Sequence, residues 1–224
     1  IEELTAFLRL YKSHLCYKHL PEAVRRIYCF RDLGDALVSD WHFFRPMVAS
    51  DLPLDVFALL RLAPGGADRA LNNLCDWWEN RHKCDVCFFF FDDLKAHHYE
   101  SVVRVQRFMD VGGGDELVRA VMAQSTHEFM SRPEHRTKFD DHGIVHEMDR
   151  LRGCSPRNRP LTGKVRVGGG TSGAGRADLP AAARWWLDWR WRCIVLPRLG
   201  FESLEDMRKA WARELGFDAR RDAT

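Results

Sequence analysis

The chain has 224 residues, 46% of them hydrophobic and 29% charged, which is the composition of a protein with a sizeable hydrophobic core. Its 34 Lys and Arg residues nearly balance its 32 Asp and Glu residues, so the net charge of +2 argues against nucleic acid as a partner. The 7 cysteines are scattered, which favours reduced thiols and a cytoplasmic location, and no apolar run is long enough to span a membrane.

Two short apolar runs are expected to form strands of one parallel sheet. The first, RIYCF at residues 26–30, predicts a short buried strand. The second, DVCFFFF at residues 85–91, is an uninterrupted apolar run, which is typical of a strand buried on both faces. Its residues Phe88 to Phe90 are therefore expected in the core.

Helical spacing of the apolar residues predicts helices between and after these strands. They are expected over residues 35–44, 67–82, 99–110, 115–126, 179–196 and 203–216. The first helix would be capped near Asp32 or Asp35, and the last would end at Gly216. Strands that alternate with helices predict one α/β domain over residues 1–224, with a mostly parallel sheet flanked by helices.

The segment 153–178 is rich in Gly, Pro and Arg, and it is expected to form a long flexible loop before the last two helices. In the tryptophan-rich helix that follows, Trp185 and Trp189 are expected to face the core. Trp186 and Trp191 are expected to cover the sheet or a partner.

Arg31 is the first candidate for a functional residue, because it stands directly after the first strand. Ligands of open parallel sheets bind where strands end and helices begin, and a guanidinium group suits a phosphate there. Ser39 in the following helix could add a hydroxyl group, which would make half of a phosphate site. Spacing alone, however, favours the alternative that Arg31 pairs with Asp32 or Asp35 at the surface.

Several stretches of the sequence resemble the motifs of one enzyme family. IYCFRDLGDALVSDWHFF resembles the motif by which cytosolic-type sulfotransferases hold the 3′-phosphate of their cofactor. YKSHL, LCDWWENRHKCDVCFFFFDDLK, STHEFMSRP and KVRVGGGTSG resemble further family segments in the same order, from about Leu10 to about Gly173. The resemblance implies a P-loop-NTPase-like sulfotransferase fold. It also implies transfer of a sulfuryl group from 3′-phosphoadenosine 5′-phosphosulfate (PAPS) to a hydroxyl or amine of a small molecule or sugar, without a metal.

The resemblance also implies individual roles. Arg31 and Ser39 match the two positions that bind the 3′-phosphate. His14 would be the general base that takes the proton of the acceptor, since a neutral hydroxyl is a poor nucleophile. Lys12 would stabilise the negative charge that develops around the sulfuryl group.

Three positions match the adenine contacts of the family. Phe91 stands where the family commonly has a tyrosine, so ring stacking is retained and a hydroxyl contact is lost. Ser125 and His127 match the remaining adenine positions, with His127 in place of an aromatic residue.

The loop that closes over the cofactor in the family carries an Arg-Lys-Gly triplet. Arg166 and Gly168 match its first and third members, but Val167 replaces the lysine. The missing phosphate contact is therefore either lost or supplied by Lys164 or Arg176.

The phosphosulfate-binding loop of the family, of the type YPKSGTTW, has no counterpart in residues 1–11, and the chain begins at Ile1 rather than at a methionine. We therefore expect the fold to be incomplete at its N-terminus and this chain alone to be a poor enzyme. The alternative is a non-catalytic remnant of the fold that serves as a binding or interaction module. A kinase-like nucleotide-binding protein is a more distant alternative. It would need a P-loop Lys-Ser/Thr pair, which this sequence does not show.

Overall fold

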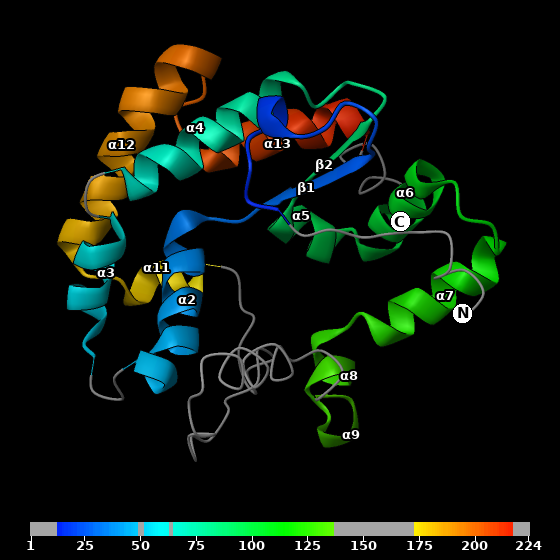
Figure 1. Cartoon of the computed structure of the whole chain (residues 1–224), viewed down its shortest axis with the longest axis horizontal. Coiled ribbons are helices and arrows are strands. Elements are labelled where there is room, and N and C mark those ends of the chain that lie inside the picture. The colour runs from blue at the N-terminus through cyan, green and yellow to red at the C-terminus, as the bar shows by residue number, and fades with distance from the viewer. Residues whose placement is uncertain (1–12, 49–51, 63–64, 137–172, 217–224) are drawn as a thin grey trace.

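The computed structural model describes residues 13–48, 52–62, 65–136 and 173–216. Two strands, β1 (Arg26–Phe30) and β2 (Val86–Phe90), lie at the centre of the molecule and form a two-stranded parallel sheet among these residues (Figure 1). In their register Phe30 lies opposite Phe90, so both strands end at the same edge of the sheet. The expected α/β fold with a parallel sheet is confirmed.

Helices surround this sheet. In chain order the described helices are η1 (Tyr17–His19), α2 (Leu33–Val48), α3 (Leu54–Leu62), α4 (Gly66–Glu79), α5 (Phe91–Ala96), α6 (His98–Met109), α7 (Gly114–Gln124), α8 (His127–Ser131), α9 (Pro133–Arg136), α11 (Ala174–Asp178), α12 (Ala181–Leu199) and α13 (Leu204–Leu215). The six helices predicted from apolar spacing correspond to α2, α4, α6, α7, α12 and α13. No helix in the described part of the chain is long and apolar enough to cross a membrane.

The expectation of a loop over residues 153–178 is wrong at its end, because residues Ala174–Asp178 form the helix α11. This helix has only 5 residues, too few to show an apolar period in the sequence. Most of the remaining segment lies outside the described residues.

The two strands differ in burial. All residues of β2 are buried, as expected. In β1 only Arg26 and Phe30 are buried, and Ile27 is 46% exposed, so the prediction of a buried strand is wrong for one face. Successive side chains of a strand point to opposite faces, and only the face that carries Tyr28 and Phe30 packs against the core.

The main core lies between this face of the sheet and the helices α4 and α13. Trp78 of α4 contacts Phe88 with ring centroids 5.6 Å apart and Trp211 of α13 at 5.9 Å. Trp77 stacks on Tyr28 at 4.8 Å. These aromatic contacts fix both strands, and therefore the edge where they end.

The prediction for the tryptophans of α12 is wrong. Trp191 is buried, with Leu187 and Val195 one turn to either side, whereas Trp185 and Trp189 are 64% and 39% exposed. Tryptophans stand on several faces of this helix, so their spacing did not identify the buried face.

Helix α2 packs through a second cluster. Leu37 and Val38 are buried against Phe57 of α3 and against Leu179 and Leu187. This packing holds in place the helix that begins directly after β1.

Candidate nucleotide site

Arg31 and Phe91 meet at the edge where the two strands end. The Arg31 guanidinium lies over the Phe91 ring, 4.9 Å from its centroid, a favourable cation–π distance. The two residues are far apart in the sequence, but β1 and β2 end opposite each other, so the residues that follow them become neighbours. The structure thus brings together a predicted phosphate ligand and a predicted adenine contact.

Lys95 of α5 also lies near this pair, with its ammonium group 5.6 Å from the centre of the Phe91 ring. The sequence patterns did not single out this lysine. A lysine four residues after Phe91, in the last turn of a short helix, could have pointed to it, because side chains four residues apart lie on the same face of a helix.

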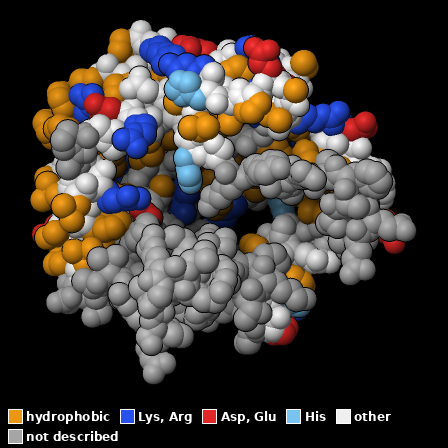
Figure 2. All heavy atoms as spheres, in the orientation of Figure 1, with side chains coloured by type: hydrophobic (Ala, Val, Ile, Leu, Met, Phe, Trp, Pro, Cys, Tyr) orange, Lys and Arg blue, Asp and Glu red, His pale blue; other side chains and the backbone are white. Residues whose placement is uncertain are grey.

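The guanidinium of Arg31 retains donor capacity. Its Nε atom is buried and has no hydrogen-bond partner among the described residues. A buried donor without a partner is unfavourable, and an anion that binds there would satisfy it. Figure 2 shows a hollow in the region where β1 leads into α2, with Lys or Arg side chains at its depth.

The alternative partner Asp32 is occupied elsewhere. Its Oδ1 atom accepts hydrogen bonds from the backbone N–H groups of Gly34 at 2.8 Å and Asp35 at 3.0 Å, so Asp32 is the expected N-terminal cap of α2. Its Oδ2 atom lies 3.2 Å from the guanidinium of Arg176. The amides of Gly34 and Asp35 at the start of α2 are therefore not free to bind a phosphate, and no pairing of Arg31 with this carboxylate is recorded among the described residues.

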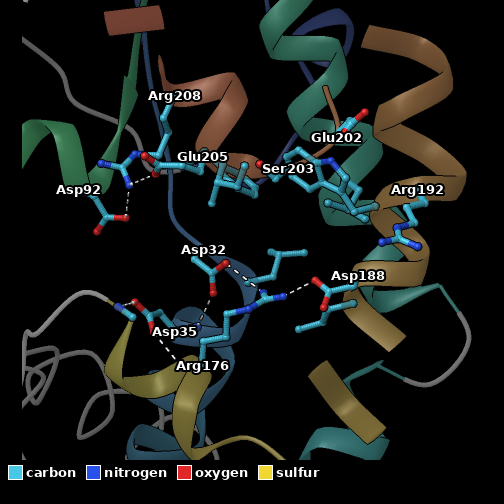
Figure 3. Close-up of a pocket in the computed structure, with 17 residues that line it drawn as sticks. Asp32, Asp35, Asp92, Arg176, Asp188, Arg192, Glu202, Ser203, Glu205 and Arg208 are labelled. Atoms are coloured by element: carbon cyan, nitrogen blue, oxygen red, sulfur yellow. Dashed lines mark hydrogen bonds and ion pairs between the residues drawn. The ribbon is translucent and has the colours of Figure 1, made fainter. Parts of the chain in front are cut away.

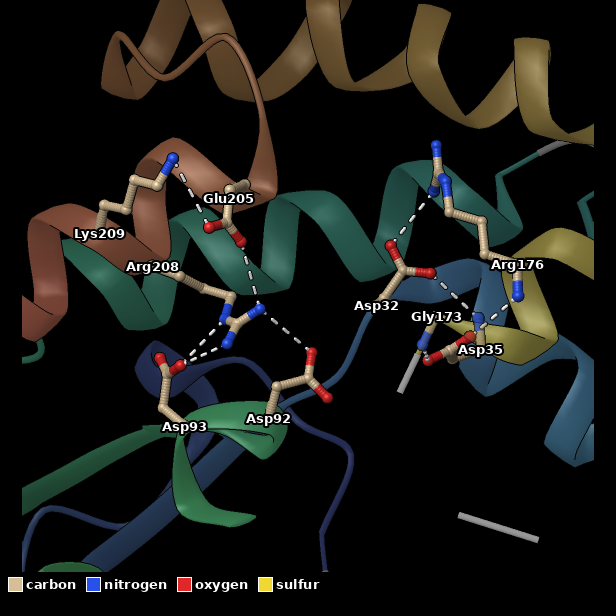
Figure 4. A network of polar contacts seen from close by, with 9 residues as sticks. All are labelled: Asp32, Asp35, Asp92, Asp93, Gly173, Arg176, Glu205, Arg208 and Lys209. Carbon is tan, nitrogen blue, oxygen red and sulfur yellow. Dashed lines mark hydrogen bonds and ion pairs between the residues drawn. The ribbon is translucent and has the colours of Figure 1, made fainter. Parts of the chain in front are cut away.

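Asp35 is likewise engaged. This residue is only 2% exposed, and its carboxylate accepts hydrogen bonds from the backbone N–H groups of Gly173 at 2.7 Å and Arg176 at 2.9 Å. Asp35 thereby ties α11 to α2, as Figure 4 shows. Both carboxylates that could have neutralised Arg31 at the surface have other partners.

Arg176 cannot easily replace the missing lysine of the closing loop as a phosphate ligand, because it pairs with Asp32 and with Asp188. That expectation from the sequence is therefore not supported for Arg176. Lys164 lies outside the described residues.

Ser39 lies on the exposed face of α2, beside the buried residues Leu37 and Val38. It lies six positions along the helix from the first residue of α2, Leu33, a rise of about 9 Å. Within the described residues the structure records no contact between Ser39 and Arg31. The helix therefore exposes the hydroxyl but does not by itself pair it with the arginine.

The two remaining adenine positions lie at the junction of α7 and α8. The Ser125 hydroxyl donates a hydrogen bond to the carbonyl of Val121 at 2.7 Å and lies 2.8 Å from Nε2 of His98. His127 begins α8, which Figure 1 places away from the two strands. No contact of Ser125 or His127 with Phe91 is recorded among the described residues.

His14 lies in an exposed, irregular segment before η1. Its neighbour Leu15 accepts a hydrogen bond from Nε1 of Trp77 at 3.4 Å, which fastens this segment to the core. Lys12, Arg166 and Gly168 lie outside the described residues. The roles predicted for these four residues stay predictions.

A cavity of about 530 Å³ lies beside the strand ends, between α2, α11, α12 and α13 (Figure 3), and neither Arg31 nor Phe91 lines it. Its wall includes six carboxylates against three arginines: Asp32, Asp35, Asp92, Asp188, Glu202 and Glu205, with Arg176, Arg192 and Arg208. This excess of negative charge repels a nucleotide with several phosphates. The candidate nucleotide site is therefore the Arg31–Phe91 side of the edge.

Arg208 of α13 holds α5 in place from this cavity. Its guanidinium lies 2.5 Å from Asp93 and 3.5 Å from Asp92, the two residues after Phe91. Burial alone would lower the pKa of Arg208, but the hydrogen bond and charge of Asp93 outweigh it and raise the pKa. Arg208 therefore stays charged and anchors the start of α5, which carries Phe91.

Comparison with known proteins agrees with the fold. The family model described as the sulfotransferase domain matches residues 2–151, so the chain belongs to the sulfotransferase family. Amine sulfotransferase of Oryctolagus cuniculus is 25% identical over 131 residues, which cover 54% of this chain and 43% of that protein. Sulfotransferase 1A1 of Rattus norvegicus is 26% identical over 147 residues, covering 57% and 47%.

A solved structure shares the fold. The crystal structure of mouse sulfotransferase SULT7A1 complexed with PAP matches with a TM-score of 0.60 and 21% identity, over 98% of this chain and 74% of that chain. The expected sulfotransferase fold is thereby confirmed. The chain spans a little under half the length of the curated relatives it matches, 43% and 47% for the two named above.

Proposed function

We propose that this chain carries the 3′-phosphate and adenine part of a PAPS site, in a sulfotransferase that acts on a small hydroxyl or amine acceptor. The observation that carries the proposal is the position of Arg31 over Phe91 at the common end of two parallel strands, with a buried Nε donor that has no partner among the described residues. The family of the chain supports the same assignment.

Arg31 would bind the 3′-phosphate through its guanidinium, and Ser39 would add a hydroxyl hydrogen bond. Phe91 would stack on the adenine ring through the face that Arg31 leaves free. Ser125 and His127 would contact the far side of the adenine. Arg166 and Gly168 would contact the phosphate from the closing segment.

The chemical step would be an in-line displacement at sulfur. His14 would take the proton of the acceptor while the acceptor oxygen or nitrogen attacks the sulfur atom. The bond from sulfur to the 5′-phosphate oxygen would break, and adenosine 3′,5′-bisphosphate would leave. Lys12 would stabilise the charge on the transferring group, so positioning and electrostatics would supply most of the rate.

The acceptor would be a small molecule, and the proposed location is the cytoplasm. The two relatives described above are named as sulfotransferases, one of them for amines. The six cysteines among the described residues are free thiols, which suits a reducing compartment.

Calorimetric titration with adenosine 3′,5′-bisphosphate tests the proposal. Arg31→Ala should weaken binding by about 10- to 100-fold, since a hydrogen-bonded charge contributes roughly 1.5–3 kcal/mol. Arg119→Ala is the matched control, because Arg119 is a surface arginine with a 79% exposed side chain. It should leave the affinity unchanged.

The wild-type chain must bind for the proposal to stand. No binding by a folded chain, or equal loss in the two variants, would contradict it and favour the non-catalytic module. Binding without sulfuryl transfer in a protein that includes a phosphosulfate-binding loop would keep the site but remove the enzymatic role.

A further inference from the structure

Arg31 stands next to an acid in the sequence. Asp32 follows it directly, and Asp35 lies one helical turn further on. A carboxylate beside a phosphate-binding arginine weakens binding in two ways, because it repels the phosphate and competes for the guanidinium. A site of this kind needs a group that neutralises the carboxylate without blocking the arginine.

Arg176 lies where it can neutralise this carboxylate. Its guanidinium lies 3.2 Å from Asp32 Oδ2, and it also pairs with Asp188 of α12 (Figure 3). The side chains of Arg176 and Asp32 are 31% and 18% exposed, so their ion pair is partly shielded from water. Asp32 thus has a cationic partner that approaches from the side of the cavity.

The backbone of Arg176 is fixed as firmly as its side chain. Its N–H group donates to the buried carboxylate of Asp35 at 2.9 Å (Figure 4). Helices α2 and α11 also approach closely at two glycines. A Cβ on Gly34 would lie 2.9 Å from Cγ of Arg176, and a Cβ on Gly175 would lie 3.0 Å from Cα of Asp35. Larger residues at either glycine would push the helices apart.

We propose that Arg176 is a positioning residue that keeps Arg31 available to the 3′-phosphate by holding and neutralising Asp32. This inference rests on the proposed function, since it concerns the same phosphate. Arg176 does not touch the nucleotide. It acts through Asp32, so its loss matters only while residue 32 carries a negative charge.

The test is a pair of substitutions measured alone and together by titration with adenosine 3′,5′-bisphosphate. Arg176→Ala should weaken binding by roughly tenfold, the effect of one uncompensated charge near the phosphate. Asp32→Asn should bind at least as well as wild type, because asparagine caps a helix about as well as aspartate. In the Asp32→Asn background, Arg176→Ala should change the affinity less than twofold.

Arg192→Ala is the matched control. Arg192 lines the same cavity, so its removal changes the charge of this region equally, but it has no ion pair among the described residues. It should change the affinity less than threefold. The proposal would be overturned if Arg176→Ala and Arg192→Ala lost equal affinity, or if the tenfold loss persisted in the double variant. Either result would mean that Arg176 acts through the general charge or the folding of the protein.

A measurement without nucleotide separates this inference from the proposed function. Phenylglyoxal modifies accessible arginines, and peptide mass spectrometry reports the extent at Arg31. Arg31 should be modified more slowly in Arg176→Ala than in wild type, and Asp32→Asn should restore the rate. If wild type does not bind the nucleotide, the proposed function fails, and an unchanged Arg31 rate in Arg176→Ala would refute the inference as well.

Discussion

The two ends of the candidate nucleotide site are built differently. The end called here the phosphate end holds Arg31 together with Phe91, the ring proposed to stack on the adenine. Both residues follow strands whose last residues, Phe30 and Phe90, are 6% and 1% exposed and lie in the main core. At the adenine end, Ser125 and His127 flank the junction of two helices, and Val118 is the buried residue of α7. A side chain is held in position only as firmly as the helix or strand that carries it. The phosphate end is therefore the more firmly held half of the site.

The substitution with the largest expected effect removes the packing beneath the phosphate end. Phe88 of β2 is fully buried between Trp78 and Trp211, so Phe88→Ala should lower the free energy of unfolding by about 3–5 kcal/mol. Val121→Ala on α7 is the comparison, because Val121 is 39% exposed and should cost less than about 0.5 kcal/mol. Urea denaturation followed by tryptophan fluorescence measures both, and similar losses would contradict the contrast between the two ends.

A substitution of intermediate effect tests whether the ring of Phe91 stacks on the adenine. Phe91→Leu should weaken binding of adenosine 3′,5′-bisphosphate by roughly tenfold, because stacking on a base contributes about 1–3 kcal/mol. Phe91→Tyr keeps the ring and should bind as well as wild type or better. Tyr99→Leu, a change at a 43% exposed ring, serves as control. If Phe91→Leu and Phe91→Tyr bind alike in calorimetry, the ring does not stack on the nucleotide.

The smallest effect is expected at the adenine end. The Ser125 hydroxyl already donates its proton to the carbonyl of Val121, so it can only accept a hydrogen bond from the base. Ser125→Ala should therefore weaken nucleotide binding less than threefold in the same titration. A loss above tenfold would show that the junction of α7 and α8 is held firmly on the adenine.

The sequence alone predicted the strands, the longer helices and the residues at the strand ends. Arg31 and Phe91 could be placed because a parallel pair of strands brings the residues after them to one edge. Asp32 as a cap was likewise predictable from its place before a helix. These features depend on local chemistry and on one strand pairing.

Contacts between distant segments could not be predicted. The distant partners of Asp32 and Asp35 are Arg176 of α11 and Gly173 directly before it. This helix is too short to leave an apolar period and is separated from α2 by more than 120 residues. The buried face of α12 was misjudged because tryptophans occur on several of its faces, and packing selected Trp191. The exposed face of β1 was missed because an apolar strand looks the same whether one or both faces are covered.

The central claim is that Arg31 binds the 3′-phosphate. Its most direct test removes the 3′-phosphate from the ligand and the guanidinium from the protein in turn. Wild type and Arg31→Ala would each be titrated with adenosine 3′,5′-bisphosphate and with adenosine 5′-monophosphate. The account predicts that wild type prefers the bisphosphate by about 10- to 100-fold and that Arg31→Ala loses this preference while binding the monophosphate as before. An undiminished preference in Arg31→Ala would contradict the assignment of the 3′-phosphate to the end of β1.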